Sequence, residues 1–323
     1  MTSISLPASL TPQTSLRALN VLKDLPRVAD LIEVCFSGTM DREGRRYIRE
    51  MRQAGQQTVV QRWATRLGEG TALPLTGYVW DEGGRIVGNT SLIPFRHSEQ
   101  RIYLIANVAV HPDFRGRGIA RALTERAMQH ARQKMADAVW LSVRADNESA
   151  LGLYASLGFI EQARRTSWDA GSDQPPSSPA KDFEIGPRRR GDWPLQRQWL
   201  DAAYPAQLSW HRRWDFSALR PGVAAWLYGW LMDLGPRQWT ARRGGNLEGV
   251  LSYLPTGHDA VLFAGLAPHA SSAALTALLL TAREFLPPRP TLSLEFPAGT
   301  HDAAIAAAGF RPQRTLVWMR AAT

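Results

Sequence analysis

The sequence contains a single cysteine, Cys35. One thiol cannot form an internal disulfide, and no histidine or second cysteine lies close enough in the sequence to suggest a zinc site or a redox pair. The scarcity of cysteine therefore predicts a chain without a metal centre, in a reducing compartment.

Long apolar runs are also missing. The longest apolar stretch, Val223 to Leu234, contains Asp233 and falls short of the roughly 20 residues that a membrane-spanning helix needs. Residues 1–8 lack the basic residue and the apolar run of a secretory signal. These absences predict a cytoplasmic protein with no membrane contact.

Lysine is scarce, because Lys23, Lys134 and Lys181 are the only ones. The formal net charge is nevertheless +9, and it comes from arginines that are spread over the whole chain. Basic residues that neutralise phosphate drive nucleic-acid binding, so the charge leaves a nucleic-acid-binding protein open. Scattered arginines equally suit a small anionic cofactor. We expect nucleic acid not to be the main partner, and the composition indicates no oligomeric state.

The chain has 323 residues, which is comfortable for two domains of ordinary size. Residues 171–181 are rich in proline and serine and show no apolar periodicity, as expected for an interdomain linker. We therefore predict an N-terminal domain over residues 1–170, the first copy, and a C-terminal domain over residues 182–323, the second copy.

The two copies repeat one another. Residues that match in the same order are Asp24 with Asp192, Gly83 with Gly244, Gly88 with Gly249, Pro112 with Pro268 and Gly158 with Gly309. The separation within these pairs never lengthens along the chain, which a duplicated unit with shortened loops predicts. Two unrelated α/β domains with turns at ordinary places are the alternative.

Apolar periodicity predicts a mixed α/β fold in both copies. In the first copy, helical spacing covers residues 25–36, 47–67 and 117–135, and strands are expected over 76–80, 85–94, 102–110, 138–143 and 159–168. Asn147 caps a further helix that ends at Leu157, with Gly158 as its left-handed stop. The second copy is expected to have strands over 260–266 and 291–296 and a helix over 272–285.

The segment from Val108 to Ala120 carries the most information. A strand ends at Val110, and Gly116 and Gly118 allow a tight turn into a helix. The N–H groups at a helix start have no helical acceptor, and their partial positive charge makes an anion site. A dinucleotide-binding fold would place such a turn after its first strand, and the chain has no Gly-x-x-x-x-Gly-Lys for a nucleoside triphosphate.

Two motifs carry a resemblance to a known family. Arg115-Gly-Arg-Gly-Ile-Ala120 fits the Arg/Gln-x-x-Gly-x-Gly/Ala signature of the GNAT (GCN5-related N-acetyltransferase) superfamily. Residues 147–159 look like its second landmark, Asn-x-x-Ala-x-x-x-Tyr-x-x-x-Gly-Phe. The resemblance implies two tandem GNAT-like domains, each a mixed, mostly antiparallel sheet flanked by helices.

The resemblance also implies a cofactor, acetyl-CoA, in an opening between the strands that end at Val110 and Val143. Backbone groups of Val108, Ala109 and Val110 would pair with the pantetheine. The pyrophosphate would be held by Arg115, Gly116, Arg117, Gly118, Ile119 and Ala120, and Asn147 would be a further contact. Tyr154 would be the catalytic residue, with its hydroxyl directed at the thioester sulfur; a core aromatic is the other interpretation of this tyrosine.

The implied activity is that of an acyltransferase: an N-acetyltransferase that moves acetyl to a primary amine of a small molecule by direct attack in a ternary complex. Many family members have a carboxylate on the strand before the glycine turn, whereas residues 104–109 offer only Asn107. We therefore name no general base. His111 is either a titrating group or a solvated turn residue. A non-catalytic acyl-CoA-binding or regulatory protein is the alternative function.

The second copy lacks the residues on which the expected cofactor site of the first copy depends. Its counterpart of the glycine turn, Pro268 to Ala274, has neither glycine nor arginine, and residues 303–308 contain no tyrosine. We expect a degenerate copy, and tandem members such as mycothiol synthase-like enzymes resemble this layout. A set of tryptophans either walls a substrate pocket or belongs to the core. They are Trp199, Trp210, Trp214, Trp226 and Trp230.

Overall fold

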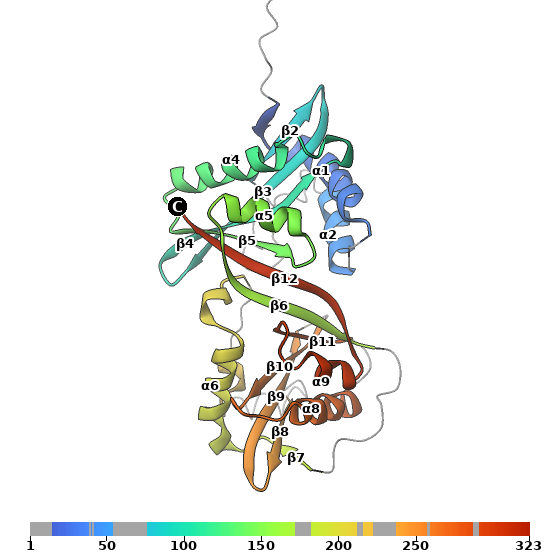
Figure 1. The fold of residues 1–323 in the computed structure, drawn as a ribbon, viewed down its shortest axis with the longest axis vertical. Coiled ribbons are helices and arrows are strands. Elements are labelled where there is room, and N and C mark those ends of the chain that lie inside the picture. The colour runs from blue at the N-terminus through green and yellow to red at the C-terminus, as the bar shows by residue number, and fades with distance from the viewer. Residues whose placement is uncertain are drawn as a thin grey trace, which may run out of the picture. The chain divides into compact units, whose positions relative to one another are not determined.

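The structure is a computed structural model that describes residues 15–38, 40, 42–53, 76–171, 182–211, 216–221, 237–256, 259–286 and 291–323. The chain forms two compact units (Figure 1). The first unit contains residues up to Leu141 together with Leu153–Phe159 and Arg320–Thr323, and the second contains Ser142–Gly152 and Ile160–Met319. The predicted linker lies outside the described residues apart from Gly171.

The first part of the chain alternates helices and strands. The elements are β1 (Leu16–Ala18), α1 (Val21–Phe36), α2 (Arg42–Gln53), β2 (Thr76–Glu82), β3 (Arg85–His97), β4 (Gln100–Val110), a 3₁₀ turn (Pro112–Phe114), α4 (Ile119–Gln133), β5 (Ala138–Arg144) and α5 (Glu148–Ser156). The strands follow the order β1-β2-β3-β4-β5. β4 and β5 run parallel, and the other neighbours run antiparallel.

Helices cover both faces of this sheet. A Cβ on Gly88 would lie 2.8 Å from Ile119 and 2.9 Å from Leu123, so Gly88 faces α4 and only glycine fits there. Ala109, one residue before Val110, the β4 partner of Gly88, faces the other way and packs with Leu25 and Val28 of α1. The sheet of the first unit is therefore buried between α1 and α4.

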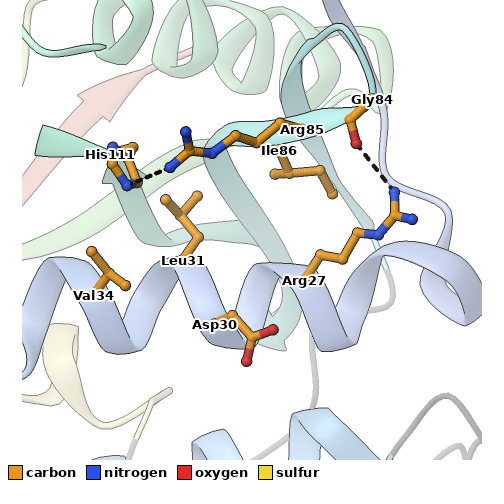
Figure 2. A pocket seen from close by; sticks show the side chains of 8 residues that line it. All are labelled: Arg27, Asp30, Leu31, Val34, Gly84, Arg85, Ile86 and His111. Atoms are coloured by element: carbon orange, nitrogen blue, oxygen red, sulfur yellow. Dashed lines mark hydrogen bonds between the residues drawn. The ribbon is translucent and has the colours of Figure 1, made fainter. Parts of the chain in front are cut away.

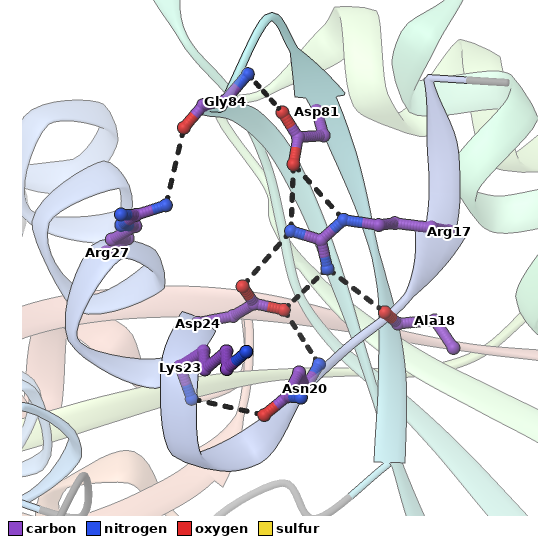
Figure 3. A network of polar contacts seen from close by, with 8 residues as sticks. All are labelled: Arg17, Ala18, Asn20, Lys23, Asp24, Arg27, Asp81 and Gly84. Carbon is purple, nitrogen blue, oxygen red and sulfur yellow. Dashed lines mark hydrogen bonds and ion pairs between the residues drawn. The ribbon is translucent and has the colours of Figure 1, made fainter. Parts of the chain in front are cut away.

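A polar cluster fixes the start of α1 (Figure 3). The Asp24 carboxylate is buried and accepts hydrogen bonds from Arg17 Nη1 at 2.7 Å and from the Asn20 N–H at 2.7 Å. Arg17 also donates to Asp81, whose carboxylate accepts from the Gly84 N–H at the tip of the β2–β3 hairpin. Burial alone would raise the pKa of Asp24, but the hydrogen bonds from Arg17 and Asn20 lower it overall.

An Arg17→Ala variant is expected to lower the free energy of unfolding by about 1–3 kcal/mol at neutral pH, because it leaves the buried Asp24 carboxylate without its cation. Because the folded-state pKa of Asp24 is depressed, this contribution is lost as the pH falls through that pKa. Urea unfolding at pH 7 and in strong acid checks both points. Arg52→Ala is the control, since its partners Asp30 and Glu33 are 63% and 50% exposed and the change should cost under about 1 kcal/mol.

The second unit repeats this plan. Its elements are β6 (Ile160–Ala170), β7 (Glu184–Pro187), a 3₁₀ turn (Arg190–Asp192), α6 (Trp193–Ala203), two further 3₁₀ turns (Ala206–Leu208 and Phe216–Leu219), β8 (Arg237–Arg243), β9 (Asn246–Thr256), β10 (Asp259–Leu266), α8 (Ser272–Phe285), β11 (Leu292–Pro297), α9 (Asp302–Ala307) and β12 (Phe310–Ala322). The strands follow the order β12-β6-β11-β10-β9-β8-β7, with β10 and β11 parallel. β6, from the first copy, pairs antiparallel with β11.

Equivalent positions of the two copies have equivalent structures. The register of β2 with β3 shifts between Trp80 and Asp81, and that of β8 with β9 shifts at the matching place, between Ala241 and Arg242. A Cβ on Gly249 would meet Leu266 and, in α8, Leu278, much as one on Gly88 would meet α4. These shared features confirm two mixed α/β copies with mostly antiparallel sheets.

Three helices start at places other than those predicted from the sequence, including α2, which begins at Arg42 rather than at residue 47. α1 begins at Val21 rather than residue 25, because the Asn20 side chain accepts a hydrogen bond from the Lys23 N–H and caps it there. α4 begins at Ile119 rather than at residue 117, because Gly118 is left-handed, with φ +76°. The helix predicted over 47–67 is described only as far as Gln53, within α2.

The remaining predictions on the described residues hold closely. Asn147 Oδ1 accepts from the Ala150 N–H at 3.1 Å at the start of α5, and Gly158 has φ +86° after its end. Trp199 and Trp210 are buried, as core residues are, whereas Trp214, Trp226 and Trp230 lie outside the described residues. Among the helices that the structure describes, none is long and apolar enough to cross a membrane.

Candidate active site

The glycine turn connects β4 to α4. Gly116 and Gly118 both have φ +76°, a left-handed conformation that L side chains avoid. A Cβ on either glycine would meet nothing within 4 Å, so the backbone conformation and not crowding requires glycine at both positions. The turn therefore exposes its backbone to open space at the start of α4.

The first backbone N–H groups of α4 point at this space. The first hydrogen bond of the helix joins the Ala122 N–H to the Gly118 carbonyl at 3.0 Å. The N–H groups of Ile119 and Ala120 come before it and have no helical acceptor, and no side chain caps the helix at Gly118. This arrangement favours binding of an anion such as a diphosphate.

Two arginines flank the turn. Arg115 Nε donates to the Val110 carbonyl at 3.2 Å. Arg117 donates to the Asp113 carbonyl, and its guanidinium lies 4.8 Å from the centre of the Phe114 ring. Both arginines donate to backbone carbonyls, and among the described residues no acidic side chain pairs with either of them. Their positive charge is therefore available to an anion.

The last residues of β4 present backbone groups on the side away from β3. The parallel pairing with β5 runs from Ile102–Ala138 to Ile105–Leu141. Past that point β4 still pairs with β3: the His111 N–H donates to Val87, and Ala109 lies opposite Asn89. Because antiparallel strands alternate, the groups of Val108 and Val110 face the other side. The groups of Val108 and the Val110 N–H are placed to pair with an extended ligand, whereas the Val110 carbonyl already accepts from Arg115 Nε and from the Cys35 thiol.

Tyr154 lies in α5 and is 7% exposed. Its ring meets Phe159 edge-on, with 6.0 Å between ring centres. Within the described residues no hydrogen-bond partner is found for its hydroxyl, and burial raises the pKa of the phenol to about 12. The hydroxyl therefore stays protonated near neutral pH and is free to donate a hydrogen bond. Arg121 of α4 donates to Ser156 at 2.6 Å, which ties this end of α5 to the glycine-turn helix.

Asn147 belongs to the second unit. Its side-chain oxygen is used as the cap of α5, which leaves the amide N–H groups as donors.

A groove of about 420 Å³ opens beside the end of β4 (Figure 2). His111 forms part of its wall, and Arg85 Nη2 lies 2.8 Å from His111 Nε2. A guanidinium only donates, so His111 Nε2 is the acceptor and its lone pair is occupied. This contact favours the interpretation of His111 as a turn residue rather than as a group that takes a proton from an amine. The groove is further lined by Arg27, Asp30, Leu31, Val34, Gly84 and Ile86.

Sequence reasoning missed a buried polar contact next to the site. Asn107 Nδ2 donates to the Tyr47 hydroxyl of α2 at 2.9 Å. An apolar pattern reveals neither the left-handed conformation of Asn107 nor the position of Tyr47 beside it. The available signal was that Asn107 is the one polar residue in 104–109. No group of His, Cys, Asp and Glu side chains that could hold a metal ion occurs among the residues that the structure describes.

Residues 36–159 match the family model described as the acetyltransferase (GNAT) family. This part of the chain belongs to the GNAT family. The matched residues contain both sequence motifs, the glycine turn and Tyr154, and GNAT proteins use acetyl-CoA. The GNAT match covers the first copy and stops at Phe159, before β6.

Two relatives of the GNAT part are named as acetyltransferases. The GNAT part is 40% identical to the ribosomal protein bS18-alanine N-acetyltransferase of Escherichia coli over 62 residues. These residues make up 19% of this chain and 42% of that protein. The GNAT part is 41% identical over 70 residues to the mycothiol acetyltransferase of Rhodococcus jostii, which covers 22% of this chain and 23% of that protein. The chain thus spans less than half the length of these relatives.

The fold of the whole chain also has a solved counterpart. A GCN5-related N-acetyltransferase from Sphaerobacter thermophilus superposes over 95% of this chain and 96% of its own, with a TM-score of 0.54 and 19% sequence identity. At that identity the likeness shows the fold, including the part beyond the GNAT match.

Proposed function

We propose that this protein is an acetyl-CoA-dependent N-acetyltransferase that transfers acetyl to a primary amine of a small molecule. The observation that carries the proposal is the glycine turn, where two left-handed glycines open the unpaired N–H groups of α4 beside a strand end with outward backbone groups. Ile119 and Ala120 would hold the diphosphate with Arg115 to Gly118, and outward backbone groups of Val108 and Val110, but not those of Ala109, which face β3, would pair with the pantetheine.

The described residues fit this cofactor. Each N–H contact at a helix start contributes about 0.3–2 kcal/mol, whereas micromolar binding needs roughly 8 kcal/mol. Several N–H groups, the charge of Arg115 and Arg117 and the buried pantetheine must therefore act together. When bound, acetyl-CoA supplies an acetyl group activated as a thioester, which the amine attacks directly in a ternary complex.

Tyr154 is the proposed catalytic residue. A phenol with a raised pKa is a poor donor of a whole proton to a thiolate, whose conjugate thiol has a pKa near 8.5. A hydrogen bond from the hydroxyl to the departing sulfur stabilises the charge that develops there without requiring that transfer. Ionised amines with a pKa near 10.4 must lose a proton first, and β4 carries no carboxylate between Ala106 and Val110 to take it. We name no base.

We propose that the second copy does not hold acetyl-CoA. At the start of α8 the Ser271 N–H donates to Glu248 Oε2 at 3.1 Å, and the Ala273 N–H donates to the Ser271 hydroxyl. The Glu248 carboxylate, which also pairs with Arg243 at 3.2 Å, thus occupies the helix start where the first copy leaves its N–H groups open.

Mass spectrometry of the purified protein with acetyl-CoA and a library of amines tests the proposed function. We expect an acetylated product that the Tyr154→Phe variant forms far more slowly. A bS18-derived peptide belongs in the library, because one relative is named for that acceptor. Binding of CoA without any acetylated amine would instead support the acyl-CoA-binding alternative, and the absence of CoA binding would reject both.

A further inference from the structure

β4 contains an extra residue at the point where it leaves β5. Its register with β3 joins Ala109 to Asn89 and Ala106 to Ser91. Two residues, Asn107 and Val108, therefore lie opposite the single residue between Asn89 and Ser91, which defines a β-bulge. Asn107 takes the left-handed conformation there, with φ +53°. Asparagine tolerates this conformation better than other residues with a side chain.

Two partly buried hydrogen bonds hold the bulge from both sides. Asn89 is fully buried, and its Nδ2 donates to the Asn107 carbonyl at 2.9 Å. The Asn107 side chain in turn donates to the Tyr47 hydroxyl, also at 2.9 Å. Since Tyr47 belongs to α2, whose Ile48 and Met51 are buried in the core with α1, the bulge is fastened to a packed helix. We call Asn89, Asn107 and Tyr47 the bulge latch.

The atoms in contact give the direction of the hydrogen bond between Asn107 and Tyr47. The Asn107 amide N–H donates, so the Tyr47 oxygen accepts, and burial raises the pKa of this phenol. A neutral phenol also keeps its own proton. An aspartate at position 107 could therefore accept that proton and restore a bond of reversed direction, whereas a residue without a polar side chain could not.

The bulge decides where the next residue points. Without the extra residue, β4 would have to slip by one position against β3 on one side of Asn107. A slip on the Val108 side would turn the backbone groups of Val108 toward β3. Val108 is the first of the residues proposed to pair with the pantetheine, next to the reacting end of the cofactor. We propose that Asn107 is a positioning residue: through Tyr47 and Asn89 it holds the bulge that orients Val108 toward the acetyl-carrying arm. This inference rests on the proposed function.

Four variants test the bulge latch. Asn107→Gly removes the amide but allows the positive φ, Tyr47→Phe removes only the hydroxyl, Asn107→Asp can restore the bond, and the fourth combines Asn107→Gly with Tyr47→Phe. We expect the first two to lower kcat about tenfold, because a small misplacement of reacting groups costs that much or more. The calorimetric Kd for CoA should stay within about threefold, since the diphosphate contacts are untouched. Asn107→Asp should recover most of kcat.

The double variant separates a latch from two unrelated defects. If both residues act through one bond, the double variant loses no more kcat than either single variant, whereas independent effects multiply. Multiplied losses, or a Kd for CoA that weakens in step with kcat, would overturn the proposal.

Hydrogen exchange of the ligand-free protein supplies a measurement that needs no activity. The amides of Ala109 and His111, which face β3 beside the bulge, should exchange at least about tenfold faster in Asn107→Gly and Tyr47→Phe, and at the parent rate in Asn107→Asp. Unchanged exchange in all variants rejects the bulge latch even if the protein acetylates amines. Faster exchange in a protein that acetylates nothing rejects the proposed function and leaves the latch standing as a structural device only.

Discussion

Replacing Tyr154 with phenylalanine is expected to lower kcat by about 10²–10³-fold, because one preorganised donor to a developing charge is worth that much in a water-poor site. The ring should stay where it is, since it is buried and packed edge-on against Phe159. The affinity for CoA should therefore change by less than about threefold. Steady-state kinetics and calorimetry on the same preparation check the two quantities.

The pH dependence follows from the burial of Tyr154. Its pKa is raised to about 12, so the hydroxyl keeps its proton, and its donor role, at every pH below that value. The ratio of kcat between the parent and Tyr154→Phe should thus be flat from about pH 6 to pH 10. A ratio that falls near pH 8 would mean that the phenol ionises there, contrary to the burial.

Tyr204→Phe provides a matched control. Tyr204 is equally buried but lies in the second unit, where its hydroxyl accepts a hydrogen bond from the Ala264 N–H. We expect this variant to lose some stability and to keep kcat. Equal losses of kcat in both variants would make Tyr154 a core aromatic and remove it from the proposed mechanism.

A Gly118→Glu variant is expected to weaken CoA binding by about 100-fold, or about 2.7 kcal/mol. A side chain at φ +76° costs about 1–2 kcal/mol in backbone strain. The added carboxylate also stands beside the N–H groups of α4, where it repels a diphosphate and competes for the same donors. Calorimetric titration with CoA measures the effect directly.

The Gly245→Glu variant is the control for the effect of backbone strain without a change in the glycine turn. Gly245 has φ +81° in the β8–β9 turn, and a Cβ there would meet nothing within 4 Å, so the substitution carries the same backbone cost without touching the glycine turn. We expect its affinity for CoA to equal that of the parent. If Gly118→Glu also binds CoA normally, the diphosphate is held elsewhere.

Local features of the fold were predictable from the sequence because they depend on neighbouring residues. The cap at Asn147, the stop at Gly158 and the left-handed turn around Gly116 and Gly118 each follow from what one side chain or its absence allows. The predicted start of α4 was wrong by two residues, because apolar periodicity alone allows Gly118 inside the helix, whereas its left-handed conformation places it before the helix.

Features that depend on distant residues were not predictable in this way. Asp24 was recognised only as a mark of the repeat, since its ion pair with Arg17 and the link of Arg17 to Asp81 need the folded hairpin. The contact between Asn107 and Tyr47 likewise joins a strand to a helix 60 residues earlier in the chain. The apolar periodicity of a sequence does not indicate which polar side chains come into contact in the folded chain.

β6 of the first copy and β11 of the second copy are paired strands of one sheet, so neither copy has a complete sheet without the other. Asp169 to Arg165 of the first copy lie opposite Ser293 to Pro297 of the second, and the inner residues of β11, Leu294 and Phe296, are buried. A gene reduced to the second copy would encode a sheet bordered by a bare apolar strand, which invites intermolecular β-pairing and aggregation. A gene reduced to the first copy would likewise leave β6 without its partner β11, so the second copy is needed for the fold even if it binds no cofactor.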